Sequence, residues 1–174
     1  MKRIAIDMDE VIADFNSKII PSFNSRFALQ ISLADLEGLT IQQLHPELRE
    51  QVEEMIGEAG FFADLDVIPH SQEVIKKLTE TYEVFITTAA MEFPLSFNAK
   101  FQWLAKHFSF ISPMNIVFCG NKSILNADYL IDDNARHFEH FRGEGILFSA
   151  PHNRQVSGFR RVSSWLEVEH LFCS

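Results

Sequence analysis

Short apolar runs alternate with stretches of helical periodicity along this chain. Runs that are almost continuously apolar are typical of parallel strands that are buried on both faces. The first such run is expected to end at Asp7. The expected strands are Ile4–Ile6, Val84–Thr87, Ile116–Phe118, Tyr129–Ile131 and Ile146–Phe148.

Apolar residues spaced three or four positions apart mark the expected helices, because that spacing places side chains on one helix face. Pro21 is expected to kink or interrupt the first helix. Ser164 and Glu167 have capping-box spacing, which predicts a last short helix after them. The apolar stripes span Ile12–Phe27, Leu48–Ile56, Val74–Leu78 and Phe97–Phe108.

Strands that alternate with helices predict an α/β fold, with a Rossmann-like parallel sheet of about five strands flanked by helices. Residues 16–69 depart from this alternation, since they contain helical stripes without a clear strand. We therefore expect a small helical cap at residues 16–69, inserted after the first strand. Residues 1–15 and 70–174 would form the Rossmann-like core.

The composition predicts a folded, soluble protein. Hydrophobic residues make up 47% of the 174 residues, which is enough for a sizeable core. The net charge of -9 argues against polymeric nucleic acid as a partner, because its phosphates need basic side chains. No signal-peptide pattern and no apolar run of about 18 residues occurs, so no membrane association is expected. Cys119 and Cys173 lie far apart and suggest reduced thiols of a cytoplasmic protein.

Acidic residues directly follow two of the expected strands. Asp7 and Asp9 come after the first strand, and Asp132 and Asp133 come after the fourth along the chain. The carboxyl ends of parallel strands form the ligand crevice of open α/β sheets. Carboxylates that lie close together repel one another, which favours a bound cation such as Mg²⁺ or a shared proton. Taken alone, each pair also fits a solvated turn or a helix cap.

Two further strand ends carry groups that suit a phosphate. Thr88 closes the second expected strand, and its hydroxyl can donate to a phosphate oxygen. Lys122 follows the third strand and supplies a compact positive charge. The strand ends together offer Asp-x-Asp, Thr, Lys and Asp-Asp. That set contains the nucleophile, acid/base, phosphate donors and metal ligands that phosphoryl transfer requires.

These residues resemble the four motifs of the haloacid dehalogenase superfamily of phosphatases. Lys122 precedes Asp132 by ten residues, as in one family of that superfamily, the 5'(3')-deoxyribonucleotidases. The resemblance to this family covers residues from about 3 to 154. The segments that are similar in order and spacing are DMDEVIADF, GFFADLDVIP, EVFITTA, LIDDN and ILFSAPHNR.

The resemblance implies a role for each motif. Asp7 would be the nucleophile and Asp9 the general acid/base. Mg²⁺ would be held by Asp7, by the main-chain carbonyl of Asp9 and by one acid of the pair Asp132 and Asp133, with Asp133 favoured over Asp132. The residues expected to bind phosphate are Thr88, Ala89 and Lys122.

The same resemblance implies a substrate pocket, and here the chain also departs from the family. Phe15 and Phe62 match aromatics of the base-binding pocket, with core packing as the alternative. Glu10 stands where the family usually has Gly. Other departures fall near the substrate and leave nucleotide selectivity open. They are Ala89 in place of Ser, Gly120 in place of Arg, and Leu39 and Thr40 in place of aromatics.

The expected function is the magnesium-dependent hydrolysis of (deoxy)nucleoside monophosphates to nucleoside and phosphate, through an aspartyl-phosphate. Two alternatives remain open. One is a phosphatase of another small phosphate ester, such as a sugar phosphate, because a fold does not fix a substrate. The other is a non-catalytic protein that binds nucleotide or magnesium. The sequence leaves the oligomeric state open between monomer and homodimer.

Overall fold

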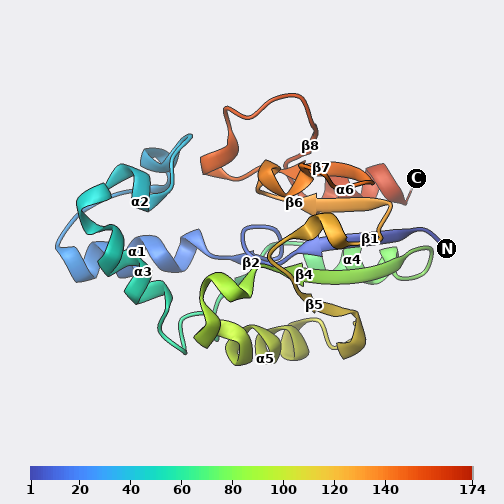
Figure 1. Ribbon diagram of the computed structural model, residues 1–174, viewed down its shortest axis with the longest axis horizontal. Helices are drawn as coiled ribbons and strands as arrows, with labels where there is room; N and C mark the ends of the chain where they lie inside the picture. The colour runs from blue at the N-terminus through green and yellow to red at the C-terminus, as the bar shows by residue number, and fades with distance from the viewer. Residues whose placement is uncertain (174) are drawn as a thin grey trace.

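A six-stranded parallel sheet forms the centre of the computed structural model, which describes residues 1–173 (Figure 1). Its strand order is β5-β4-β1-β6-β7-β8, and every neighbouring pair is parallel. This confirms the α/β class and all the strands expected from the apolar runs. The strands are β1 (Arg3–Asp7), β4 (Glu83–Thr88), β5 (Ile116–Phe118), β6 (Tyr129–Asp132), β7 (Glu144–Phe148) and β8 (Arg160–Val162).

The sequence did not predict β8, the sixth strand of this sheet. It has only three residues, of which Arg160 is exposed, and it pairs with β7 alone. Charged side chains on a short edge strand keep it from pairing with other chains. The same charges conceal the strand from a search for apolar runs.

Three α-helices accompany the sheet, namely α4 (Ser71–Leu78), α5 (Phe97–His107) and α6 (Trp165–Phe172). α4 and α6 pack side by side. The capping prediction for α6 is confirmed, because the side chain of Ser164 accepts a hydrogen bond from the backbone N–H of Glu167. Among the described residues, no helix has both the length and the apolar character that crossing a bilayer requires.

The buried face of α5 differs from the predicted stripe. Phe97, the first residue of that stripe, is 37% exposed, whereas Lys100 is only 3% exposed. Trp103 is buried and its indole N–H donates to the carbonyl of Leu65 at 2.7 Å. A charged residue therefore occupies a core-facing position of this helix, and its partners lie in the site described below.

A helical segment lies between β1 and β4 and extends beyond the carboxyl end of the sheet (Figure 1). The antiparallel strands β2 (Ala13–Asp14) and β3 (Asp66–Val67) join its two ends. The expectation that residues 16–69 lack a strand is therefore wrong at β3, whose two residues are too few to form an apolar run. Pro21 does not interrupt α1. The helices are α1 (Asn16–Phe27), η1 (Leu33–Leu36), α2 (Ile41–Leu44), η2 (Pro46–Leu48) and α3 (Arg49–Ile56).

One continuous set of buried apolar side chains runs from the sheet into this segment. Ile6 and Ile86 of the sheet belong to the same set as Phe23 and Val52 of the segment. The division into a core and a cap remains a prediction. Short 3₁₀ turns complete the structure: η3 (Ala90–Glu92), η4 (Pro94–Ser96), η5 (Pro113–Asn115), η6 (Lys122–Ile124), η7 (Ala135–Phe138) and η8 (Pro151–Asn153).

Candidate active site

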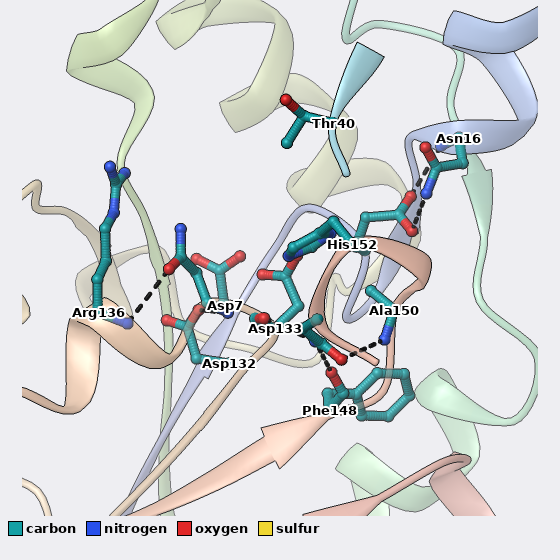
Figure 2. A network of polar contacts seen from close by, with 12 residues as sticks. Asp7, Asn16, Thr40, Asp132, Asp133, Arg136, Phe148, Ala150 and His152 are labelled. Carbon is teal, nitrogen blue, oxygen red and sulfur yellow. Dashed lines mark hydrogen bonds and ion pairs between the residues drawn. The ribbon is translucent and has the colours of Figure 1, made fainter. Parts of the chain in front are cut away.

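Three carboxylates meet where the neighbouring strands β1 and β6 end. Asp7 is the last residue of β1, Asp132 is the last residue of β6, and Asp133 follows it. One oxygen from each lies within 4.8 Å of the others, and Figure 2 shows the three side chains gathered together. The parallel pairing of β1 with β6 produces this arrangement, because it brings both strand ends to one edge of the sheet.

Lys122 lies beneath this cluster and joins two of the carboxylates. Its ammonium contacts Oδ1 of Asp7 and lies 2.6 Å from Oδ2 of Asp132. The side chain is fully buried. Burial alone would lower the pKa of Lys122, but the charges of Asp7 and Asp132 outweigh burial and raise that pKa. Lys122 therefore carries a fixed positive charge beside Asp7.

The three carboxyls are unequally stabilised as anions. Burial, with the charges of Asp132 and Asp9, raises the pKa of Asp7 to about 6 despite Lys122. Burial and the neighbouring Asp132 and Asp7 raise the pKa of Asp133 well above its usual value. Burial also acts on Asp132, but Lys122 and a hydrogen bond from His137 outweigh it and lower its pKa.

This cluster fits a divalent cation. A single lysine offsets three carboxylates, so negative charge remains in a buried position. Hard cations such as Mg²⁺ prefer carboxylate oxygens combined with phosphate oxygens and water. A cation between Asp7 and Asp133 would favour the ionised forms of both, which burial disfavours.

Asp9 and Thr88 share a second buried lysine, Lys100. The ammonium of Lys100 contacts Oδ2 of Asp9, donates to Oγ1 of Thr88 at 3.1 Å, and lies 4.2 Å from the centre of the Phe62 ring. The other carboxylate oxygen of Asp9, Oδ1, is buried without a hydrogen-bond partner. Asp9 is thus fixed through one oxygen, and its second oxygen is available to a ligand.

A cavity of about 270 Å³ opens above these groups, between the strand ends and the helical segment. Its floor includes Asp7, Asp9 and Asp133, and its wall includes Phe15 and Phe62. The two rings stack with their centres 6.1 Å apart. Both aromatics therefore lie at this cavity, and their contact with a base remains a prediction.

The remaining predicted residues take different positions around the cavity. Ala89 lines it, whereas Thr88, Lys122 and Asp132 are fully buried behind the groups that do. The hydroxyl of Thr88 reaches the site through the hydrogen bond from Lys100. All the predicted residues are thus brought together, and their catalytic and binding roles remain proposals.

Sequence reasoning missed the residues that hold the acidic pair. Nδ1 of His137 lies 2.9 Å from Oδ2 of Asp132. Nε2 of His152, which Figure 2 labels, lies 3.4 Å from Oδ2 of Asp133. Asn153 donates through Nδ2 to the backbone carbonyl of Asp133 at 2.7 Å. His152 and Asn153 belong to the segment ILFSAPHNR, whose resemblance to the family was the available signal. Nothing in the local sequence marks Lys100.

Glu10 follows Asp9 with a positive φ of 58°. Its carboxylate accepts hydrogen bonds from the backbone N–H and the side-chain amide of Asn16, at 2.8 and 2.5 Å. Burial is the main cause that raises the pKa of Glu10 to about 7. Both residues line the cavity.

The whole chain matches one protein-family model. Residues 1–174 match the family described as 5' nucleotidase, deoxy (pyrimidine), cytosolic type C protein. The chain belongs to this family. A relative from Bacillus subtilis, named 5'(3')-deoxyribonucleotidase, is 40% identical over 168 residues, which cover 97% of this chain and 96% of the relative. A Staphylococcus aureus protein that carries the same name in provisional form is 50% identical over 171 residues, which cover 98% of this chain and 95% of that protein.

Solved structures support the fold at much lower sequence identity. A haloacid dehalogenase-like protein from Agrobacterium tumefaciens superposes with a TM-score of 0.67 at 13% identity, covering 99% of this chain and 98% of that one. A haloacid dehalogenase family hydrolase from Deinococcus radiodurans, solved with phosphate and sodium, has a TM-score of 0.67 at 12% identity, covering 98% of this chain and 94% of that one. The 5' nucleotidase family member described here therefore has the haloacid dehalogenase fold.

Proposed function

We propose that this protein is a magnesium-dependent phosphomonoesterase that hydrolyses (deoxy)nucleoside monophosphates to nucleoside and phosphate. The observation that supports this most directly is the position of Asp7. It lies between a buried lysine and a second carboxylate, on the floor of a cavity with an aromatic wall. A phosphate can approach Asp7 while a nucleobase contacts Phe15 and Phe62. The names of the relatives agree with this substrate class.

In the proposed mechanism, Asp7 attacks phosphorus and forms an aspartyl-phosphate. Lys122 orients the attacking carboxylate and offsets charge that develops on the phosphate oxygens. Thr88 and the backbone of Ala89 line the same edge of the sheet and complete the phosphate site. Mg²⁺, held by Asp7, by the carbonyl of Asp9 and by Asp133 with Asp132 behind it, would neutralise phosphate charge.

Asp9 is the proposed general acid and base. Its unpaired Oδ1 can give a proton to the leaving sugar oxygen and later take one from the water that hydrolyses the intermediate. Lys100 holds the opposite oxygen and so fixes the direction in which Oδ1 points. Lys100 is therefore a positioning residue in this scheme.

Two further expectations belong to the same proposal. Residues 16–69 would act as a cap over the core formed by residues 1–15 and 70–174, excluding bulk water from the cavity. We expect the enzyme to work in the cytoplasm. The oligomeric state stays open, and sedimentation measurements would distinguish a homodimer from a monomer.

The function is tested by phosphate release from a panel of monophosphates, with and without Mg²⁺. The panel contains deoxy- and ribonucleotides in 5' and 3' forms, together with sugar phosphates. Magnesium-dependent release that favours nucleotides would support the proposal. A preference for a sugar phosphate would refute the nucleotide assignment, and no release from any ester would leave a binding protein as the better interpretation.

Mg²⁺ is expected to stabilise the protein more strongly at pH 7.5 than at pH 5. A carboxyl whose pKa is raised on folding costs stability above its ordinary value of 3.8, and Asp7 and Asp133 both have raised pKa values. Without metal, stability should therefore fall as the pH rises from about 4 to about 6. The midpoint of thermal unfolding, measured with and without Mg²⁺ at both pH values, tests this.

Two variants separate the side-chain ligand from the backbone ligand. Asp133→Ala should abolish most of the Mg²⁺-induced rise in the unfolding midpoint, because it removes a carboxylate from the cluster. Asp9→Ala should keep most of it, since the proposed ligand of Asp9 is its main-chain carbonyl. The opposite order would contradict the proposed division of roles.

Lys100→Met should lower kcat on a nucleoside monophosphate about tenfold to a hundredfold, because Asp9 loses the cation that fixes it. An aryl phosphate whose leaving group needs no proton should be hydrolysed with a much smaller loss. Lys106, an exposed lysine on the same helix, provides the matched control Lys106→Met. An equal loss on both substrates would argue that Lys100 supports the fold rather than Asp9.

A further inference from the structure

Glu10 and Asn16 form a polar pair in the cavity wall that the mechanism above does not use. Glu10 directly follows Asp9, and Asn16 is the first residue of α1. Oε1 of Glu10 accepts from the backbone N–H of Asn16, and Oε2 accepts from its side-chain amide. Figure 2 shows Asn16 and these two hydrogen bonds at one side of the site, with Arg136 at the other. The pair thus connects the loop of Asp9 to the helical segment.

The backbone at Glu10 adopts a conformation that is unfavourable for a residue with a long side chain. Its φ of 58° lies in the left-handed region, which long side chains rarely adopt and Gly adopts readily. An unfavourable backbone conformation persists where the surrounding contacts hold it, and such conformations are common at binding sites.

The pair lines the same cavity as the residues proposed to hold the phosphate and the base. Asp7, Phe15 and Phe62 line this cavity together with Glu10 and Asn16. Glu10 is adjacent in sequence to Asp9, and its partner Asn16 is adjacent to Phe15. A ligand with its phosphate at Asp7 and its base against the rings would have its pentose between these groups, in the cavity that Glu10 also lines.

The chemistry of the pair selects among the groups that a pentose can carry. In its ionised form Glu10 only accepts hydrogen bonds, and each of its oxygens keeps a free acceptor site beyond the one that Asn16 occupies. A hydroxyl can donate to that site, whereas a second phosphate would be repelled. We propose that Glu10, held by Asn16, recognises the free hydroxyl of the pentose and excludes nucleotides that carry a second phosphate there. This inference rests on the proposed nucleotidase function.

The test compares three substrates with the full-length enzyme and Mg²⁺. They are a 2'-deoxynucleoside 5'-monophosphate, its 2',3'-dideoxy analogue and the corresponding 3',5'-bisphosphate. Wild-type kcat/KM should favour the deoxynucleotide over the dideoxy analogue by about tenfold to a hundredfold, the effect of one hydrogen bond to a charged group. Glu10→Gln should reduce this preference to about threefold, mainly through KM, and should improve turnover of the bisphosphate.

A matched control separates recognition from helix capping. Asp14 accepts from the backbone N–H of Ser17 at 3.0 Å, so it caps the same helix, and it lies outside the cavity. Asp14→Asn should leave the preference for the hydroxyl unchanged. Asn16→Ala keeps the backbone N–H and should weaken the preference less than Glu10→Gln does. It serves as the second test if the Gln variant does not fold.

The outcomes distinguish this inference from the proposed function. A wild-type enzyme that hydrolyses deoxy and dideoxy monophosphates equally well would refute the inference and leave the nucleotidase function standing. A wild-type enzyme that hydrolyses no nucleotide would refute both. A Glu10→Gln variant that loses thermal stability and activity on both substrates, with their ratio unchanged, would show that Glu10 only supports α1.

Discussion

Asp7→Asn is expected to lower kcat on nucleoside monophosphates by about 10⁴-fold or more while the protein remains folded. The amide cannot attack phosphorus, so no aspartyl-phosphate forms and hydrolysis loses its first step. The fold should persist, because Asn has nearly the same shape and Lys122 keeps its contact with Asp132 at 2.6 Å. Phosphate release and far-ultraviolet circular dichroism, measured on the same preparation, test both statements.

The matched control for this loss is Asp64→Asn. Asp64 is an exposed carboxylate that pairs with Lys18 away from the cavity, so its variant should retain wild-type turnover. Substrate binding gives a second check, because the Asp7→Asn variant should still bind a nucleoside monophosphate that it no longer hydrolyses. Wild-type turnover by the purified Asn variant would exclude Asp7 as the nucleophile.

The sequence predicted which residues the fold brings together, because these residues lie at strand ends, and their catalytic and binding roles stay predictions. Asp7 is far from Lys122 and Asp132 along the chain, yet each of the three comes at or after the end of a short apolar run. Parallel pairing brings the carboxyl ends of those strands to one edge of the sheet. The apolar runs predict the strands, and the rule that ligands bind at the carboxyl ends of parallel strands predicts that these side chains lie together. No knowledge of side-chain contacts was required.

The sequence could not reveal residues whose role depends on a partner from another element. Lys100 lies in α5, where the helical stripe suggested a different buried face. Its burial is explained by partners from other elements, namely Asp9 after β1, Thr88 of β4 and the ring of Phe62. β8 was missed for the opposite reason, since charged residues conceal a short edge strand. A pattern of apolar residues indicates which positions are buried by the hydrophobic effect. It does not indicate a charged residue that is buried by an ion pair, or a strand that is exposed at the edge of a sheet.

Glu10 shows a further limit of pattern reading. The sequence revealed the departure from Gly, but it could not show that the carboxylate turns toward Asn16 or that the backbone adopts a positive φ. Those two observations change the meaning of the substitution. From the sequence alone, Glu10 is an added charge beside the nucleophile. In the structure, its carboxylate is a hydrogen-bond acceptor that Asn16 holds in the cavity wall.

Lys122→Met is expected to destabilise the metal-free protein by about 3–5 kcal/mol near neutral pH, which is the usual effect of removing one partner from a buried ion pair. Asp7 and Asp132 would both remain buried without their shared cation. The effect should depend on pH in a definite direction. In the wild type, the lowered pKa of Asp132 adds stability above the ordinary value of 3.8, and that contribution is lost as the pH falls.

Without Lys122, both carboxyls would favour protonation, so the deficit should be large at pH 8 and smaller at pH 5. Mg²⁺ should restore part of the lost stability at pH 8, because it neutralises the same cluster. The free energy of unfolding in urea, measured at both pH values with and without Mg²⁺, tests this. Lys77→Met serves as the control, since Lys77 pairs with Glu169 on the surface. A deficit that is equal at both pH values and unaffected by Mg²⁺ would mean that Lys122 contributes through packing, and its proposed role of offsetting the carboxylates would then be wrong.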